Sequence, residues 1–276
     1  MPAPCCWCVV PGQFVVVNIV IFMDLSKFRL DGKVALITGA GRGIGLAMGE
    51  TLASAGCTVA IQDIDLAVAE ASASGITQAG GRAIALGGDL TDTALPAKLV
   101  ADIAARVGSI DILINNGGIQ MAQPWMEMPV EDMRRQWDAN VLVPILLCRL
   151  VVPEMKRKHW GRIVNIGSIQ QRRGNPGMLA YSLSKATLER LTTALASELA
   201  RDNITINCIA PGWINTHRNR ADFPNPEEIQ KKGKHIPLGR IGEPKDFGPI
   251  TLTLCSEAGN YITGQTIYVD GGMSVH

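Results

Sequence analysis

The sequence KVALITGAGRGIG, residues 33–45, places an apolar run directly before a turn that contains four glycines. Such a run is typical of a buried parallel strand, and residues 46–55 are mostly helix formers. A strand, a glycine-rich turn and a helix in this order point backbone N–H groups at a phosphate in front of the helix. The glycines also allow the close approach of a pyrophosphate. We therefore expect residues 38–45 to hold a dinucleotide.

The same alternation of strands and helices continues along the chain. Regular βαβ alternation predicts a parallel sheet with helices on both faces, and no linker or shift in composition divides residues 27–276. The sequence thus predicts one α/β domain, a doubly wound parallel sheet (Rossmann fold) of about seven strands. The further strands are expected at residues 58–62, 82–88, 110–114, 162–168, 204–209 and 265–269, and the further helices at 66–79, 95–107, 131–158 and 177–201.

Polar side chains stand where four of the predicted strands end. They are Asp63, Asp89, Asn116 and Ser168. In open α/β sheets, ligands bind outside the carboxyl ends of the strands. We therefore expect these side chains to surround one site.

The choice of cofactor depends on Asp63 and Arg42. An acid at the end of the second strand accepts hydrogen bonds from the adenosine ribose and repels a 2′-phosphate. Arg42, inside the glycine turn, is a contrary cue because its charge would attract that phosphate. The sequence favours NAD, with NADP as the alternative, and a solvated strand-end acid is the plainer interpretation of Asp63.

Tyr181 and Lys185 are four residues apart, so on a helix both project from one face. An ammonium beside a phenol favours the phenolate, and we expect it to lower the Tyr181 pKa from its reference value of about 10. That change would suit general acid–base work. Taken alone, the pair is more often two unrelated surface residues; Ser168 and the dinucleotide turn favour a functional interpretation.

Asn140 lies inside the predicted helix over residues 131–158, four residues before Pro144. A proline frees a backbone carbonyl and favours a kink. A polar side chain at a kink in a helix that faces the sheet indicates a water or relay site.

Composition limits the partners and the compartment. The net charge of +1 gives no strong electrostatic case for nucleic acid or a membrane surface. Four cysteines stand singly in apolar surroundings, which is typical of free thiols in a reducing compartment such as the cytoplasm: Cys57, Cys148, Cys208 and Cys255. The cluster Cys5-Cys6-Trp7-Cys8 has no second Cys/His group to complete a tetrahedral site, so we predict no metal.

The first residues are interpreted separately. Residues 14–23 are nearly continuously apolar but too short to span a bilayer. They are preceded by no basic residue and followed by no clear cleavage site, which argues against a secretory signal. We interpret residues 1–22 as an upstream extension with Met23 as the natural start, treat 1–26 as lying outside the folded domain, and keep a membrane-tethering leader as the alternative.

Over residues 27–273 the sequence resembles the short-chain dehydrogenase/reductase family. The turn Thr38-Gly39-x-x-x-Gly43-Ile44-Gly45 is similar to the family's cofactor turn, and Asn115-Asn116-Gly117-Gly118 resembles its Asn-Asn-Ala-Gly element with glycine in place of alanine. Four residues match the family's catalytic positions: Asn140, Ser168, Tyr181 and Lys185. The resemblance implies an NAD(P)-dependent oxidoreductase that interconverts a secondary alcohol and a ketone.

The resemblance also implies the role of each residue. Ser168 holds the substrate oxygen, Tyr181 transfers its proton, and Lys185 binds the nicotinamide ribose and lowers the Tyr181 pKa. Asn140 positions a water that connects Lys185 to solvent. Pro211-Gly212 with Thr216 looks like the segment that holds the nicotinamide carboxamide. The expected cofactor-binding set is Gly39, Gly41, Arg42, Gly43, Ile44, Gly45, Asp63, Asp89, Leu90, Asn116, Gly118, Tyr181, Lys185, Pro211, Gly212, Ile214 and Thr216.

Substrate contacts are expected from the loops at residues 119–127, 169–178 and 215–236. These loops are rich in amide and cationic donors, which suit sugars, polyols and sugar acids, whereas a steroid pocket should be more apolar. Several of the charges are equally well interpreted as solvated. The expected substrate set is Ser168, Gln170, Arg172, Asn175 and Tyr181.

Within the family, the sequence is similar to gluconate 5-dehydrogenase-like and to 3-oxoacyl-[acyl-carrier-protein] reductase-like members. Basic loops fit either an anionic sugar acid or an acidic carrier protein, and Asp63 favours the sugar. A catalytically idle dinucleotide-binding regulator is a further alternative, which the complete set of four catalytic residues disfavours. The family also implies a homotetramer formed through the helices at 131–158 and 177–201.

Overall fold

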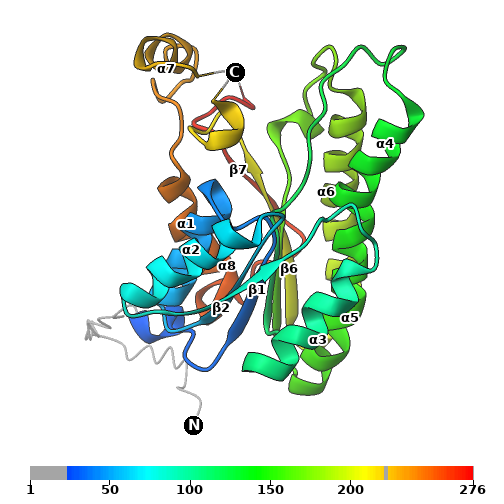
Figure 1. Cartoon of the computed structure of the whole chain (residues 1–276). Coiled ribbons are helices and arrows are strands. Elements are labelled where there is room, and N and C mark those ends of the chain that lie inside the picture. Colours follow the sequence, from blue (N-terminus) through cyan, green and yellow to red (C-terminus); the bar gives the residue numbers. More distant parts are fainter. Residues whose placement is uncertain (1–23, 221–222, 276) are drawn as a thin grey trace, which may run out of the picture.

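Seven parallel strands form the sheet at the centre of the computed structural model, which describes residues 24–220 and 223–275 (Figure 1). The strand order is β3-β2-β1-β4-β5-β6-β7, so the chain works outward from β1 first on one side and then on the other. This confirms the predicted doubly wound parallel sheet. The predictions for residues 1–22 fall outside the described residues. The strands are β1 (Val34–Ile37), β2 (Thr58–Asp63), β3 (Arg82–Gly87), β4 (Ile112–Asn115), β5 (Gly161–Ile166), β6 (Ile204–Pro211) and β7 (Thr266–Val269).

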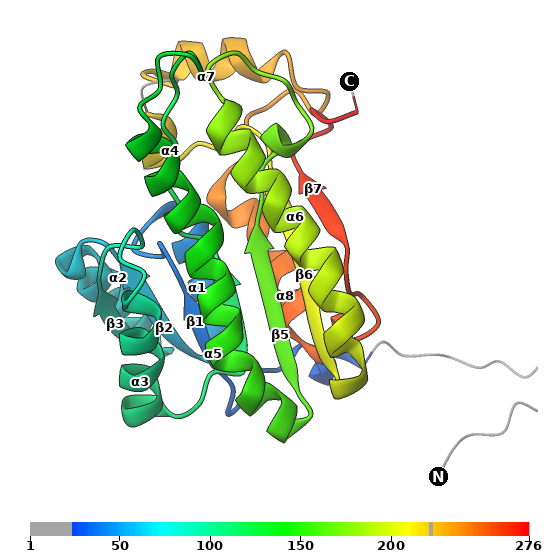
Figure 2. The same cartoon turned by 90° about the vertical axis from the view of Figure 1, so that its right-hand side faces the viewer.

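Helices cover both faces of the sheet (Figures 1 and 2). One face carries α1 (Gly43–Ser54), α2 (Leu66–Gln78) and α8 (Gly248–Cys255). The other carries α3 (Leu95–Val107), α4 (Val130–Trp137), α5 (Val143–Lys158) and α6 (Leu179–Leu199). The short helix α7 (Pro226–Gly233) lies beyond the sheet, near the carboxyl ends of the strands.

The two faces explain why β1 is apolar at every position. Ala35 and Ile37 pack into the core under α1 and α8, whereas Val34 and Leu36 pack into the core under α3 and α5. A strand buried on both faces needs apolar residues throughout instead of alternation. The unbroken run before the glycine turn is therefore a direct consequence of the helices on both sides.

The helix predicted over residues 131–158 is divided into three parts. Between α4 and α5 the chain forms a π-helical turn, Asp138–Leu142, with Asn140 buried at its centre. Pro144 follows in the first turn of α5 and has no N–H to continue the ordinary α-helical pattern back to residue 140. The kink expected there takes the form of a widened turn, and the chain stays helical from Val130 to Lys158, which confirms the prediction of a long helical stretch with a kink.

Cys57, Cys148, Cys208 and Cys255 are buried free thiols, as the sequence predicts. Burial raises the pKa of Cys208 to about 11 and that of Cys148 to about 12, so these thiols stay protonated at neutral pH. In the described part of the chain, no helix combines the length and apolar character needed to cross a membrane.

Replacing Gly45 with alanine should destabilise the fold by about 1–3 kcal/mol. A Cβ at this position would lie 2.6 Å from the Asn116 Nδ2 atom and 2.7 Å from the Gly39 carbonyl oxygen, and backbone cannot yield as a flexible side chain does. Urea unfolding measures the change.

The matched control is Gly75→Ala in α2, where an added Cβ meets nothing within 4 Å. This variant should gain about 0.5–1 kcal/mol because alanine is the better helix former. Equal effects of the two substitutions would contradict the close packing at Gly45.

Candidate active site

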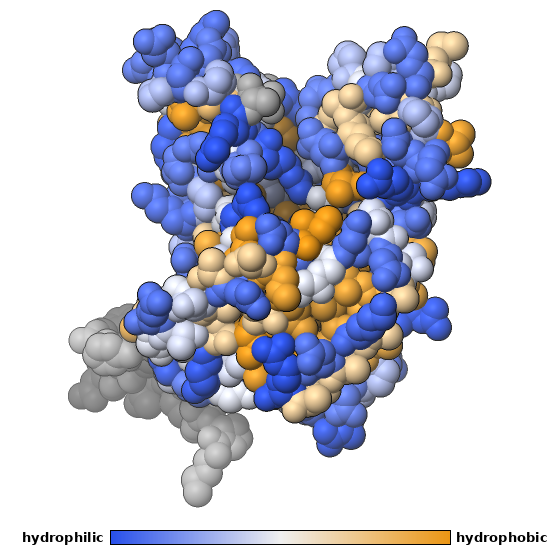
Figure 3. Space-filling model, viewed as in Figure 1, coloured by the Kyte–Doolittle hydropathy of each residue, from blue (hydrophilic) through white to orange (hydrophobic). Residues whose placement is uncertain are grey.

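A pocket of about 660 Å³ lies at the carboxyl ends of the strands and runs from the glycine turn to α6. Figure 3 shows the surface hollowed between the part that carries α7 and the part that carries α4 and α6. The strand order reverses between β1 and β4, and at such a switch point the loops diverge and leave a crevice. The four strand-end residues Asp63, Asp89, Asn116 and Ser168 all line this pocket.

The glycine turn has a backbone that only glycine adopts without strain. Gly39 and Gly43 have φ values of 59° and 61°. The turn is fixed from below because the Gly39 N–H donates to Gln62 Oε1 at 3.1 Å and the Gly41 N–H donates to Asp63 Oδ2 at 3.1 Å. The N-terminus of α1 follows at Gly43, which lines the pocket with its backbone exposed to a ligand. This cradle fits a pyrophosphate.

Asp63 is placed for the adenosine end of the pocket. Its carboxylate is buried and also accepts from the Asp65 N–H at 3.2 Å. Asp89 lies beside it at the end of the neighbouring strand and accepts from the Thr91 N–H at 2.8 Å. Arg42 is exposed at the rim of the same end. Asp63, which favours NAD, and Arg42, which favours NADP, therefore both line the pocket.

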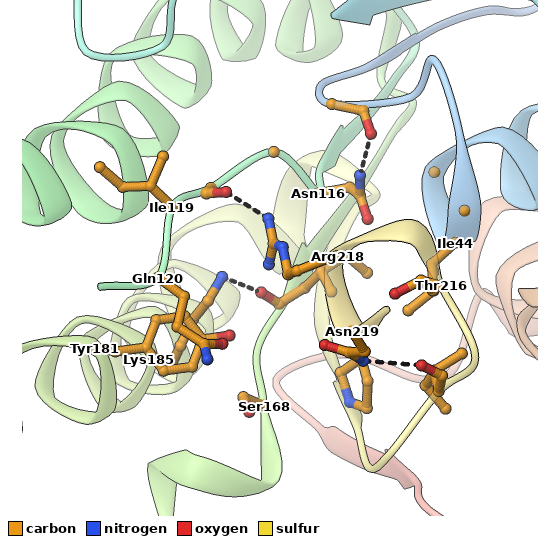
Figure 4. Close-up of a pocket in the computed structure, with 18 of the residues that line it drawn as sticks. Ile44, Asn116, Ile119, Gln120, Ser168, Tyr181, Lys185, Thr216, Arg218 and Asn219 are labelled. Carbon is orange, nitrogen blue, oxygen red and sulfur yellow. Dashed lines mark hydrogen bonds between the residues drawn. The ribbon is translucent and has the colours of Figure 1, made fainter. Parts of the chain in front are cut away.

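Ser168, Tyr181 and Lys185, which the sequence predicts to be catalytic, line one end of the pocket, which we call the catalytic end (Figure 4). Tyr181 and Lys185 project from the first turns of α6, and Ser168 follows β5. The Lys185 Nζ atom donates to the Ile166 carbonyl at 2.8 Å, which fixes the amine below the tyrosine. The structure thus brings together three of the four residues expected to be catalytic.

The electrostatics at Tyr181 differ from the prediction. Burial raises the Tyr181 pKa above its usual value, and the Arg218 charge and the Ser168 side chain act in the opposite direction. Lys185 Nζ lies 5.7 Å from the centre of the tyrosine ring. Burial and the Arg218 charge lower the pKa of Lys185 itself to about 7, so its ammonium loses a proton more easily than that of an ordinary lysine. The predicted lowering of the Tyr181 pKa by Lys185 was wrong, because both groups are buried too deeply.

Asn140 occupies a different place from the other three. Its side-chain amide accepts from the Ile119 N–H and donates to the Ile119 carbonyl, both at 2.9 Å, and also donates to Ser184 Oγ at 3.0 Å. It is buried behind the segment that follows Gly118 and does not itself line the pocket. Asn140 therefore ties that segment to α6, and its role in positioning a water stays a prediction.

Most of the predicted catalytic, cofactor and substrate residues line the pocket; Gly41, Asn140 and Arg172 do not. Gly41 contributes from beneath, through its hydrogen bond with Asp63. Arg172 is 63% exposed, pairs with Glu189 at 3.2 Å and lies over the Tyr268 ring, so the structure does not bring it to the site.

Sequence reasoning missed several residues of the pocket. Gln62 is fully buried and links the glycine turn to Gly88, and a polar residue inside an apolar strand was a signal for it. Met178, Trp213 and Phe223 give the pocket an apolar wall that the polar loop composition concealed.

Comparisons with known proteins agree with this geometry. A family model described as enoyl-(acyl carrier protein) reductase matches residues 39–274. A 3-oxoacyl-[acyl-carrier-protein] reductase FabG of Aquifex aeolicus is 40% identical over 249 residues, which cover 90% of this chain and 99% of that protein. A 7alpha-hydroxysteroid dehydrogenase of Escherichia coli K12 is 38% identical over 247 residues, which cover 90% of this chain and 96% of that protein.

Solved structures give the same result. A 7alpha-hydroxysteroid dehydrogenase complexed with NADH and 7-oxo glycochenodeoxycholic acid has a TM-score of 0.86 at 37% identity, covering 91% of this chain and 98% of that one. A gluconate 5-dehydrogenase from Burkholderia cenocepacia, in complex with NADP and tartrate, has a TM-score of 0.85 at 33% identity with the same coverage.

The doubly wound sheet, the phosphate cradle and the tyrosine–lysine pair define a dinucleotide-dependent oxidoreductase. At this level of identity over nine-tenths of the chain, it belongs to the short-chain dehydrogenase/reductase family. Its reaction is therefore the NAD(P)-dependent interconversion of an alcohol and a ketone.

Tyr181→Phe should lower kcat by about 10²–10⁴-fold, because phenylalanine has no hydroxyl to exchange a proton with the reacting oxygen. Binding of the reduced cofactor, measured by its fluorescence, should remain. Tyr261→Phe is the control, because Tyr261 is fully exposed and should tolerate the change without loss of turnover.

The pH profile gives a second readout of the same residue. Since burial raises the Tyr181 pKa, alcohol oxidation, which needs the deprotonated tyrosine, should become faster as the pH rises through the alkaline range. Ketone reduction, which needs the protonated tyrosine, should not. An identical profile in Tyr181→Phe would show that another group carries the proton.

Proposed function

We propose that the chain oxidises a polyhydroxylated small molecule: a sugar, a polyol or a sugar acid. The observation that supports this most directly is at Gln170, whose Oε1 atom is buried and has no hydrogen-bond partner among the described residues. Gln170 lines the pocket two residues after Ser168. A buried acceptor without a donor costs roughly 1–3 kcal/mol, and a substrate hydroxyl would supply that donor. The amide of Asn175 lines the same pocket and adds to the polar set.

The residues divide the chemistry as follows. Ser168 and Tyr181 hold the reacting oxygen of the substrate, and Tyr181 takes its proton during oxidation and returns it during reduction. Lys185, whose amine donates to the Ile166 carbonyl, binds ribose hydroxyls of the cofactor in this proposal. The nicotinamide, when bound, supplies the hydride chemistry.

A 3-oxoacyl-[acyl-carrier-protein] reductase is the second candidate. The apolar wall of Met178, Trp213 and Phe223 favours it, since an acyl chain needs apolar surface. The FabG relative supports it as well. The unpaired Gln170 oxygen has no evident use with such a chain, and for that reason we place this activity second.

A substrate panel separates the two. Polyols and aldonates should be oxidised with higher kcat/KM than that for acetoacetyl thioester reduction. Gln170→Leu should lower kcat/KM for the hydroxylated substrates by about tenfold, the value of one hydrogen bond, and leave any thioester activity unchanged. Gln78→Leu, on the exposed face of α2, is the control. Turnover of the thioester alone would overturn the proposal.

We propose NAD as the preferred cofactor. Two backbone N–H groups hold the Asp63 carboxylate at the pocket, where its charge would repel a 2′-phosphate. Asp63→Ser should raise the ratio of kcat/KM for NADPH over NADH by about tenfold. Asp65→Ser, which removes an exposed acid two residues away, should leave the ratio unchanged. A wild-type preference for NADPH would contradict the assignment.

We further propose that the chain forms a homotetramer and that it acts in the cytoplasm. Large apolar side chains are exposed on and next to α4, α5 and α6, the helices expected to mediate assembly: Trp125, Val130, Trp137, Leu150, Leu179 and Leu183. Covering such side chains favours association. The buried free thiols suit a reducing compartment.

A further inference from the structure

Arg218 reaches into the catalytic half of the pocket from the loop that follows β6 (Figure 4). The loop beneath it is well fixed. The Asn219 side chain donates to the Ile214 carbonyl at 2.8 Å, and the Asn215 N–H donates to the Gly242 carbonyl at 2.8 Å. The backbone of Arg218 is therefore anchored, while its guanidinium extends into the pocket.

With the residues that the structure describes, the guanidinium makes one hydrogen bond, through Nη2 to the Gly118 carbonyl. A Cβ placed on Gly118 would lie 3.6 Å from Lys185 Nζ, so Gly118 is a neighbour of the Lys185 amine. Arg218 also influences the charges of both Tyr181 and Lys185. Its guanidinium is thus close to the place where the reacting oxygen binds.

A guanidinium has five N–H donors in a planar fork that matches a carboxylate. Within the described part of the chain, no carboxylate forms an ion pair with Arg218. Of the residues that the structure describes, the acids that line the pocket are Asp63 and Asp89, which lie at the adenosine end, on β2 and after β3. Among the described residues that line the catalytic end, Arg218 and Lys185 are joined by no acid, and such a site favours an anion.

We propose that Arg218 binds the carboxylate of the substrate, so that this enzyme acts on hydroxy acids in preference to neutral polyols. The proposal rests on the proposed oxidation of polyhydroxylated molecules and narrows it to the anionic class. The single bond to Gly118 is the contact that the substrate carboxylate replaces. A charge-assisted bidentate pair is stronger than a neutral hydrogen bond to a carbonyl, which makes the exchange favourable.

The test compares D-gluconate with D-sorbitol, which share a polyol chain and differ at one end in a carboxylate or a hydroxymethyl group. Arg218→Met, similar in length but uncharged, should lower kcat/KM for gluconate about 100-fold and change that for sorbitol less than about threefold. Arg218→Lys keeps the charge without the fork and should recover about tenfold of the loss. Arg220→Met, an exposed arginine outside the pocket, should behave as wild type.

Titration calorimetry of gluconate into the complex with reduced cofactor adds a readout that does not need turnover. Binding should weaken in Arg218→Met and not in Arg220→Met. An equal loss for gluconate and sorbitol, or a wild type that prefers sorbitol, overturns the role of Arg218 and leaves the polyol dehydrogenase intact. A wild type that turns over neither compound and reduces acetoacetyl thioesters overturns the proposed function and the role of Arg218 together.

Discussion

The close approach of two backbone turns at the centre of the sheet is the constraint on which the site depends. Asn116, at the end of β4, donates through its side chain to the carbonyls of Thr38 and Gly39, each at 2.8 Å. A Cβ on Gly39 would lie 2.7 Å from the Gly117 Cα, so no side chain fits between these turns. Tying β1 to β4 in this way fixes the point where the strand order reverses, and the loops beyond it diverge into the pocket.

A second connection orients the catalytic helix relative to that centre. The segment after Asn116 continues to Ile119, whose backbone is held on both sides by the Asn140 amide. The same amide donates to Ser184 on α6, one residue before Lys185. The π-helical turn lets Asn140 contact Ile119 and Ser184 at the same time. A widened turn changes the direction of its side chains from the one that regular α-helical spacing would give. One buried side chain thereby connects the segment that follows β4 to the helix that carries Tyr181 and Lys185.

The sequence predicted those parts of the site that topology alone determines. The residues that follow parallel strands meet at one edge of the sheet, so Asp63, Asp89, Asn116 and Ser168 could be placed together without a structure. The positions of residues within a turn could not be predicted in this way. Gln170 lines the pocket and Arg172, two positions later, lies on the surface, and this division depends on the 3-10 turn Ile169–Gln171. The sign of the Tyr181 pKa change depends on the depth of burial, which a spacing of four residues does not reveal.

Among the described residues that line the pocket, the acids lie at one end and Arg218 and Lys185 at the other, and this arrangement links the charge of the proposed substrate to the Lys185 amine. The pKa of Lys185 is about 7 because burial and the Arg218 charge both disfavour the ammonium. An anion paired with Arg218 would weaken that repulsion and add an attraction, and both effects raise the Lys185 pKa. In the proposed mechanism the ammonium of Lys185 is the form that donates to ribose hydroxyls of the cofactor. On that proposal an anionic substrate would help to charge Lys185, whereas a neutral substrate would leave the repulsion from Arg218 unchanged.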